Sequence, residues 1–375
     1  MEYDAIVVGA GPAGCAAAYD LAKAGRSVLL LDRFEFPRQK ACAGGVTVRA
    51  LKALRYSVAP VIRAVCRQMV MSKELGEVEV FRARHPVCVM TVRSEFDHYC
   101  FERTREAGAA FRVVKRIESL RAGPDGVSLS TEQGSVTGRY LIGADGANSR
   151  IRRLSRDFPQ GEGGFAIEAC VPLGGRKDPQ MECDFGVVPD GYGWVFPKGD
   201  HLNVGVGWSG PGRRFGRREL EAYTRAKLGV ADCGRIIGAP ISLGGTAYAP
   251  NAERIFLVGD AAGLVDPLLG EGICNAIKSG QAAAAAVRCG LAGERSALEA
   301  FREAMAPIQD DLERCALSAA AFYRDMESGW RRLNRPHVRY ALMKGYAAGW
   351  DFRDIERLSW RVLFARVPRL DLGGA

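Results

Sequence analysis

The sequence contains few of the residues that build metal sites, disulfide frameworks and membrane spans. Only four of its 375 residues are histidine, and its eleven cysteines include no C-x-x-C pair. We therefore expect no metal site and no disulfide framework. No apolar run approaches the length of a membrane span, and the first residues lack the basic leader of a secretory signal. These absences predict a soluble, cytoplasmic protein in a reducing compartment.

What the chain does contain is typical of a globular protein. Hydrophobic residues make up 47% and charged residues 25% of the sequence. The chain of 375 residues is longer than one hydrophobic core usually accommodates, so we expect two domains. The net charge of +9 permits an anionic partner. No nucleic-acid-binding motif is present, and we expect no nucleic-acid partner. The sequence gives no indication of the oligomeric state.

The first part of the chain has the pattern of a nucleotide-binding α/β domain. Residues 5–8 form an apolar run typical of a buried parallel strand, and a glycine-rich turn follows at residues 9–14. Residues 16–24 predict a helix and residues 27–31 a second buried strand. A similar strand is predicted at residues 254–258. Alternating strands and helices of this kind favour a doubly wound parallel sheet.

Further along the chain, short runs of alternating polarity predict an inserted antiparallel sheet. These runs lie at residues 77–82, 127–131, 166–171, 192–196 and 201–208. From residue 296 the pattern is helical. We thus expect an α/β fold with a Rossmann-like nucleotide domain, an inserted antiparallel-sheet domain for the substrate, and a helical C-terminal region. The expected bounds are 1–70, 93–157 and 240–295 for the first, 71–92 and 158–239 for the second, and 296–375 for the third.

The turn after the first strand has the G-x-G-x-x-G spacing of dinucleotide-binding proteins. Gly9 permits a tight turn, Gly11 lets a pyrophosphate approach the main chain, and Gly14 allows close packing of strand and helix. The helix that follows offers its free N–H groups to the phosphates. Asp32 ends the second strand, where its carboxylate can accept hydrogen bonds from a ribose. Together these features predict a bound dinucleotide.

Two later turns favour a flavin over a nicotinamide. A carboxylate at Asp260 follows the strand at residues 254–258, from where it can hold the hydroxyl groups of a ribityl chain. The turn at residues 270–272 can present main-chain N–H groups to the negative charge of a reduced flavin ring. The alternative is that Asp260 only caps a helix.

Residues 141–150 are a further buried strand that runs into a sharp turn. In this order, the glycine turn at residues 9–14, residues 141–150 and residues 254–273 resemble the motifs of the flavoprotein superfamily of p-hydroxybenzoate hydroxylase. Two further stretches resemble the geranylgeranyl reductase family of FAD-dependent oxidoreductases. One is residues 37–45, in which Ala43 stands where the family usually has a glycine. The other is residues 191–207, with the pattern Tyr192-x-Trp194-x-Phe196-Pro197 followed later by Gly205 and Gly207.

The resemblance implies an FAD cofactor held by residues of all these motifs. The pyrophosphate would lie at Gly9, Gly11, Ala13 and Gly14, and the adenosine at Asp32, Arg33 and, through its main chain, Ile117. The phosphates would also be reached by Arg93, for which the alternative is a surface ion pair with Glu95 or Asp97. The flavin would lie against Cys42, Ala43, Gly45, Gly272 and Ile273, and its ribityl chain against Asp260.

The resemblance also implies the reaction, which is reduction of isolated C=C bonds in polyprenyl chains. The substrate would be a polyprenyl lipid or a prenyl diphosphate, and NADPH or a reduced ferredoxin-like protein would supply electrons. Tyr192, Trp194 and Phe196 alternate along one strand, so they share a face and can form a wall for the chain; ordinary core packing is the alternative. Cys42, Tyr192 and Trp194 are the candidate catalytic residues, with Cys42 as a proton relay or a flavin contact. A buried, unreactive thiol is the alternative for Cys42.

Two basic segments predict contacts with anions. Arg49, Lys52 and Arg55 fall at helical spacing, where a substrate diphosphate or an NADPH phosphate can bind; a solvated helix face is the alternative. Residues 324–369 hold eleven basic and five acidic residues interleaved with aromatic ones, which favours a peripheral contact with a membrane surface. Ordinary helix packing is the alternative here.

Other chemistries occur on the same scaffold. The main rival is a flavin-dependent monooxygenase or halogenase, because the motif at residues 192–197 is close to the Trp-x-Trp-x-Ile-Pro motif of flavin halogenases. This chain lacks the first Trp and the Ile of that motif, which favours the reductase. A flavin-holding protein without turnover is the third hypothesis.

Overall fold

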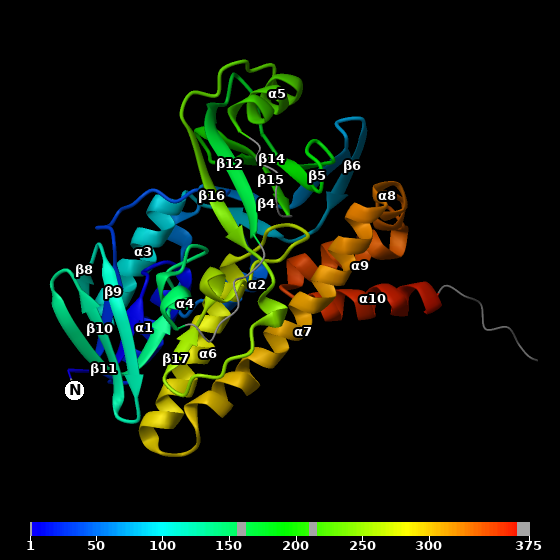
Figure 1. Cartoon of the computed structure of the whole chain (residues 1–375). Coiled ribbons are helices and arrows are strands. Elements are labelled where there is room, and N and C mark those ends of the chain that lie inside the picture. Colours follow the sequence, from blue (N-terminus) through cyan, green and yellow to red (C-terminus); the bar gives the residue numbers. More distant parts are fainter. Residues whose placement is uncertain (1, 156–162, 210–215, 366–375) are drawn as a thin grey trace, which may run out of the picture.

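The computed structural model describes residues 2–155, 163–209 and 216–365. Figure 1 shows a first sheet with its helices, a second sheet above it, and a set of C-terminal helices along one side of both. The predicted mixed α/β architecture and its helical C-terminal region are confirmed.

The first sheet contains the nucleotide-binding pattern. Its strand order is β8-β2-β1-β11-β10-β9, and β17 also pairs with β11. The strands are β1 (Tyr3–Val8), β2 (Val28–Asp32), β8 (Ala110–Val113), β9 (Ile117–Gly123), β10 (Gly126–Thr131), β11 (Gly134–Gly143) and β17 (Ile255–Leu257). Strands β8, β2, β1, β11 and β17 run parallel. All five residues of β2 are buried, as the continuous apolar run predicts for a strand covered on both faces.

The run at residues 127–131 is an exception to the prediction of an inserted sheet. It forms β10, which pairs antiparallel with β9 and β11 inside the first sheet. The reason is local, since short connections join β10 to β9 and to β11 and a chain that reverses so tightly pairs with its immediate neighbour. The other four alternating runs belong to the second sheet.

The second sheet has the order β16-β12-β15-β14-β13-β5-β6. Its strands are β5 (Gln68–Lys73), β6 (Glu77–Arg82), β12 (Gly163–Pro172), β13 (Met181–Phe185), β14 (Gly191–Pro197), β15 (His201–Ser209) and β16 (Ile236–Ser242). The prediction of a purely antiparallel sheet is wrong, because β5 and β13 pair in parallel. These two strands come from distant segments, so no hairpin dictates their direction. Strands β5 and β16 cross the expected bounds at residues 70 and 239; the bound at residue 157 lies outside the described residues.

A small third sheet, β3-β7-β4, adjoins the segment predicted to contact the flavin. Its strands are β3 (Gly45–Thr47), β4 (Ala64–Cys66) and β7 (Cys88–Met90). The pairing of Gly45 with Met90 fixes the end of the loop that contains Cys42.

Helices cover the first sheet and extend past the second. Helix α1 (Pro12–Lys23) packs closely against α6 (Ile273–Ala292), and a Cβ atom on Gly280 would lie 2.2 Å from the Ala13 carbonyl oxygen. The remaining helices are α2 (Val48–Ala53), α3 (Arg93–Glu106), α4 (Arg150–Ser155), α5 (Arg217–Leu228), α7 (Ala297–Arg324), α8 (Met326–Leu333), α9 (Pro336–Ala348) and α10 (Phe352–Ala365), with 3-10 turns η1 (Ala59–Val61), η2 (Gly245–Ala247) and η3 (Gly259–Ala262). None of the described helices is both long and apolar enough to cross a bilayer.

Candidate functional site

One cavity of about 1170 Å³ reaches from the first sheet to the C-terminal helices. Small-molecule sites usually have volumes of about 300–1,000 Å³, so this space exceeds what one ordinary ligand needs. With the exception of Gly14, every residue predicted to contact FAD, to form the aromatic wall or to take part in catalysis lines it. The roles of these residues stay predictions, but the residues lie around one space.

The glycine turn forms the nucleotide end of the cavity. Gly9 has φ +103°, a left-handed conformation that favours glycine, and a Cβ atom there would lie 2.2 Å from the Ala144 carbonyl oxygen. Gly14 lies below the turn, where a Cβ atom would come within 1.7 Å of the Gly9 carbonyl oxygen. Gly14 therefore permits the close packing of strand and helix and does not face the cavity.

The start of helix α1 suits a pyrophosphate. Gly11, which precedes the first helical residue, provides no side-chain cap. The atom nearest to the place that a Cβ on Gly11 would take is Nη2 of Arg38, at 3.6 Å. Free N–H groups, a helix dipole and a guanidinium thus converge on open space. This arrangement fits the phosphates of FAD, which when bound and reduced supplies a hydride. Sequence reasoning missed Arg38.

Asp32 and Arg93 belong to one buried ionic group. Asp32 accepts hydrogen bonds from the N–H groups of Ala10 (2.8 Å) and Phe34 (3.0 Å), and each oxygen keeps a second lone pair for a ribose hydroxyl. Arg93 makes a bidentate pair with Asp97, at 2.8 Å for both bonds, and Arg38 contacts the same carboxylate at 3.2 Å. Arg93 is only 8% exposed, so its ion pair with Asp97 is not the surface pair considered as the alternative.

The adenosine end is completed by residues 114–118. The Ile117 carbonyl oxygen accepts a hydrogen bond from Nε of Arg150 at 3.1 Å. This contact holds the start of β9 against α4, and Ile117 lines the cavity together with Arg33, which follows the end of β2.

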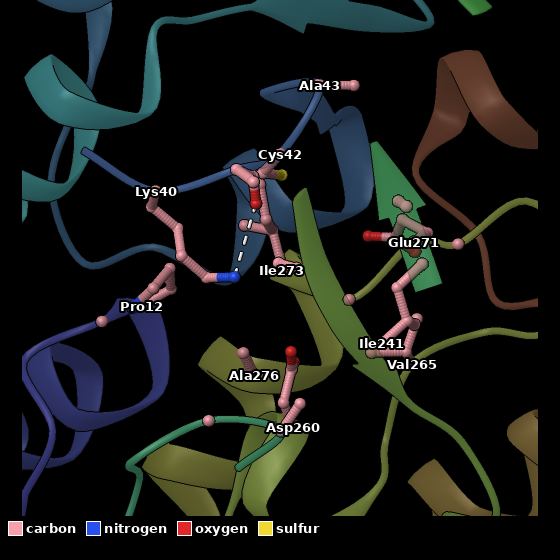
Figure 2. Close-up of a pocket in the computed structure, with 18 of the residues that line it drawn as sticks. Pro12, Lys40, Cys42, Ala43, Ile241, Asp260, Val265, Glu271, Ile273 and Ala276 are labelled. Atoms are coloured by element: carbon pink, nitrogen blue, oxygen red, sulfur yellow. Dashed lines mark hydrogen bonds between the residues drawn. The ribbon is translucent and has the colours of Figure 1, made fainter. Parts of the chain in front are cut away.

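The flavin end lies between Cys42 and Asp260. Figure 2 shows these two residues on opposite sides of the cavity, with Pro12 and Lys40 along one flank and Val265 along the other. Oδ1 of Asp260 lies 3.6 Å from the position that a Cβ atom on Gly272 would take. The carboxylate and the amide groups that begin α6 therefore face the same space.

The loop that contains Cys42 tolerates alanine where the family usually has glycine. Gly44 has φ +64°, and a Cβ atom there would lie 2.2 Å from the Thr91 carbonyl oxygen, whereas Ala43 is not among the residues with positive φ. The position that requires glycine is thus Gly44. Ala43 adopts a backbone conformation that does not require glycine.

Two buried charged residues of the second sheet hold this loop, and sequence reasoning missed both of them. Oε1 of Glu168 accepts a hydrogen bond from the Cys42 N–H at 2.9 Å. Nζ of Lys198 donates to the carbonyl oxygens of Ala43 and, at 3.0 Å, Thr91. Burial raises the pKa of Glu168 and lowers the pKa of Lys198 to about 8. The only signal in the sequence is a charged residue inside or directly after an apolar strand.

The aromatic residues of β14 line the cavity as predicted for one face of a strand. Nε1 of Trp194 donates to Oδ1 of Asn203 at 2.7 Å, and the indole lies over Gly205, where a Cβ atom would come within 2.0 Å of the ring. The Tyr192 hydroxyl donates to the Leu269 carbonyl oxygen, and burial raises the pKa of Tyr192 well above its usual value. Because both polar groups already have partners, these side chains are suited to form a wall.

The far end of the cavity is apolar. Its lining comes from the second sheet, the loop before α6 and helices α7, α9 and α10, and includes Met69, Met71, Met181, Leu268, Tyr323, Tyr346, Phe352 and Ile355. Such a surface binds a hydrocarbon chain by excluding water.

The predicted anion site at Arg49, Lys52 and Arg55 is wrong. Arg49 is surrounded by carboxylates, and its guanidinium contacts Glu271 (2.8 Å), Asp311 (2.6 Å) and Asp351 (3.2 Å). Lys52 donates to the Ala348 carbonyl oxygen, and Arg55 pairs with Asp20. These positive charges serve contacts between helices, which the helical spacing alone could not reveal.

Comparison with known proteins agrees with this geometry. Residues 2–169 match the FAD binding domain model. The chain is 35% identical to digeranylgeranylglycerophospholipid reductase 1 of Methanopyrus kandleri over 76% of this chain and 80% of that one. It is 32% identical to the geranylgeranyl diphosphate reductase of Rhodobacter capsulatus over 76% and 75% of the two chains.

Solved structures show the same fold. A geranylgeranyl bacteriochlorophyll reductase-like protein from Thermoplasma acidophilum superimposes with a TM-score of 0.77 over 95% of both chains, at 22% identity. The flavin-dependent brominase Bmp2 superimposes with a TM-score of 0.74 over 97% of this chain and 99% of that one, at 17% identity. At such identities the likeness concerns the fold alone.

The fold and the cavity define a flavin-dependent oxidoreductase with an FAD-binding domain. Its sequence relatives narrow the class further. The chain belongs to the geranylgeranyl reductase family of FAD-dependent oxidoreductases.

Proposed function

We propose that the protein reduces isolated C=C bonds in a polyprenyl chain with electrons from FAD. The observation that carries the proposal is the single cavity, which joins the nucleotide end to an apolar end lined by helices α7, α9 and α10. A dinucleotide occupies only one part of such a space. The other part suits a hydrocarbon chain brought against the flavin.

The residues around the flavin end support this chemistry. An isolated alkene cannot stabilise an anion, so a proton must arrive with the hydride, and water must be kept away from the reduced ring. Cys42 carries the one thiol of the loop at the flavin end, and Tyr192, Trp194 and Phe196 form the apolar wall beside it. We assign Cys42 as the proton donor and the three aromatic residues as the wall that positions the chain.

The headgroup and the electron donor belong to the same proposal. One relative is named for a glycerophospholipid and the other for a diphosphate, and their shared chemistry is the prenyl chain. The G-x-G-x-x-G turn between β1 and α1 belongs to the FAD site, so we propose that NADPH binds without a domain of its own. A reduced ferredoxin-like protein is the other donor that we propose to test.

Peripheral binding to a membrane surface would give the enzyme access to a lipid. Support comes from helices α7, α9 and α10, where Leu317, Tyr340 and Trp360 are 68%, 51% and 59% exposed. These helices also carry many basic residues, and aromatic and basic side chains together favour the interface of an anionic bilayer. Pelleting with vesicles that contain anionic lipid tests this contact.

The central test is an anaerobic assay with chemically reduced protein. We expect geranylgeranyl diphosphate or a digeranylgeranyl lipid to gain two hydrogens for each bond reduced, as read by mass spectrometry. Asp260→Ala should lose FAD and activity, because its carboxylate faces the flavin end, and Asp125→Ala, in an exposed turn, should lose neither.

Other outcomes identify the rival functions. A product that requires oxygen would indicate a monooxygenase, and one that requires halide a halogenase. Reduced flavin that no lipid, oxygen or halide substrate oxidises would indicate a flavin carrier.

A further inference from the structure

Two tyrosines from different parts of the fold hold the turn that precedes α6. On β14, the Tyr192 hydroxyl donates to the Leu269 carbonyl oxygen. On α7, the Tyr323 hydroxyl donates to the Leu268 carbonyl oxygen at 3.1 Å. Burial raises the pKa of both hydroxyls, so each keeps the proton that it donates. Two consecutive carbonyl groups of the turn are thus fixed, one by a strand and one by a helix.

The turn also has an internal frame, which depends on Asp266. The N–H group of Asp266 donates to the Glu271 carbonyl oxygen at 3.1 Å, and its carbonyl oxygen accepts the Gly270 N–H at 2.9 Å. Its carboxylate accepts the Leu268 N–H at 2.7 Å. Gly270 has φ +68°, a conformation that favours glycine. These bonds shape the turn but lie within it, so its place in the molecule depends on contacts from outside.

The last residues of the turn face the predicted flavin. Gly272 precedes the first residue of α6 and provides no side-chain cap, and the first N–H groups of a helix have no acceptor inside the helix. The side chain of Glu271 is held by Thr47 at 3.2 Å and Arg49 at 2.8 Å. The tyrosines hold the main chain of the turn just before these residues. Both sets of contacts therefore limit the direction in which the free N–H groups point.

The two tyrosines are joined to each other through aromatic packing. The ring centroid of Tyr192 lies 5.8 Å from that of Phe185 on β13. The Phe185 ring in turn lies 4.9 Å from that of Phe322, which directly precedes Tyr323 on α7. Such pairs stabilise the contact between the second sheet and the helix. Both tyrosines also line the cavity, so the side chains that hold the turn also form part of the wall of its apolar end.

We propose that Tyr192 and Tyr323 are positioning residues that aim the N–H groups of residues 270–272 at the flavin and thereby raise its reduction potential. N–H groups held in this direction stabilise the negative charge of the reduced ring more than they stabilise the neutral oxidised ring. The inference rests on the proposed function only for the hydrocarbon chain, which would lie against the same two side chains. The effect on the flavin requires no lipid.

Hydrogen–deuterium exchange in the oxidised holoprotein tests whether the tyrosines hold the turn. Tyr192→Phe and Tyr323→Phe keep the ring and lose only the hydroxyl, so each should speed exchange of the amide hydrogens of residues 268–272 about fivefold. The matched control is Tyr99→Phe. Its hydroxyl donates to the Ser57 carbonyl oxygen at 3.0 Å, away from the residues that line the cavity, so exchange at residues 268–272 should stay unchanged.

The flavin potential separates positioning from ordinary stabilisation. Midpoint potentials are measured in the yellow holoproteins by anaerobic equilibration with a reference dye. Tyr192→Phe and Tyr323→Phe should each lose about a factor of five in affinity for reduced relative to oxidised FAD, which lowers a two-electron potential by about 20 mV. Tyr99→Phe loses a hydrogen bond of the same kind. It should therefore be destabilised to a similar extent in urea, yet it should keep the native potential.

Each outcome has a separate meaning. Unchanged exchange at residues 268–272 in Tyr192→Phe or Tyr323→Phe would overturn the role of that tyrosine. Faster exchange with an unchanged potential would overturn the effect on the flavin, and so would an equal shift of the potential in Tyr99→Phe. The expected shifts in a protein that reduces no prenyl lipid would instead contradict the proposed function.

Discussion

Replacing Arg49 with methionine should destabilise the protein more than the loss of an ordinary ion pair. The guanidinium, whose side chain is 13% exposed, lies among Glu271, Asp311 and Asp351. Removing one partner of a buried charge group costs about 3–5 kcal/mol, here because Glu271 and Asp311 lose their contact with the guanidinium, whereas Asp351 keeps its ion pair with Lys278 at 2.8 Å. Since Glu271 lies in the turn beside the flavin end, the variant should also bind FAD more weakly. Urea unfolding and flavin fluorescence measure the two effects.

The matched control for this prediction is Arg55→Met. Arg55 pairs with Asp20, but its side chain is 55% exposed, so its loss should cost less than about 1 kcal/mol. Contacts with Lys278 and Arg49 lower the pKa of Asp351, so the stability that Arg49 provides through this carboxylate is lost as the pH falls through that pKa. The deficit of Arg49→Met should therefore be smaller at about pH 3 than at about pH 7. Equal unfolding free energies for the two variants, or a deficit independent of pH, would refute the reasoning.

Three further predictions concern other parts of the cavity. Gly205→Ala should destabilise the protein by about 1–3 kcal/mol in urea unfolding, because the added methyl meets the Trp194 ring. Arg38→Gln should weaken FAD binding about tenfold by fluorescence titration, since one charge beside the pyrophosphate is lost. Burial raises the pKa of Asp266 to about 6, so this carboxyl stabilises the fold when protonated at low pH and loses that contribution as pH rises through 6. Asp266→Asn should accordingly be more stable than the native protein at about pH 8, by up to about 3 kcal/mol, but not at about pH 4.

Matched control variants separate these effects from a non-specific loss of stability or FAD binding. Gly163→Ala, where an added methyl meets no atom of the described residues within 4 Å, should leave stability unchanged, and Arg121→Gln, on an exposed position of β9, should bind FAD normally. A pH-independent gain for Asp266→Asn would contradict the burial of that charge. Unaltered FAD affinity in Arg38→Gln would remove Arg38 from the phosphate site.

The nucleotide end of the site could be predicted because its determinants are local. The turn at residues 9–14 and Asp32 are separated by one helix and one strand, and the spacing alone brings them to one edge of the sheet. The shared face of the aromatic residues along β14 could also be predicted from local sequence, because alternate residues of a strand point to the same face of the sheet.

The contacts that hold the Cys42 loop could not be predicted in this way. Glu168 lies 126 positions beyond Cys42, and Lys198 lies 155 positions beyond Ala43. Their meeting depends on how the second sheet packs on the first. The parallel pairing of β5 with β13 was missed for the same reason.

The cavity draws its two ends from different stretches of the chain. The residues predicted to contact the phosphates and the flavin ring all precede α7, whereas part of the apolar lining comes from positions such as Tyr346, Phe352 and Ile355. Substitutions in α7, α9 and α10 can therefore lengthen, shorten or bend the apolar part of the cavity while the residues predicted to hold FAD stay unchanged. Under the proposed function, evolution can thus change which lipid chain is accepted without changing the flavin site.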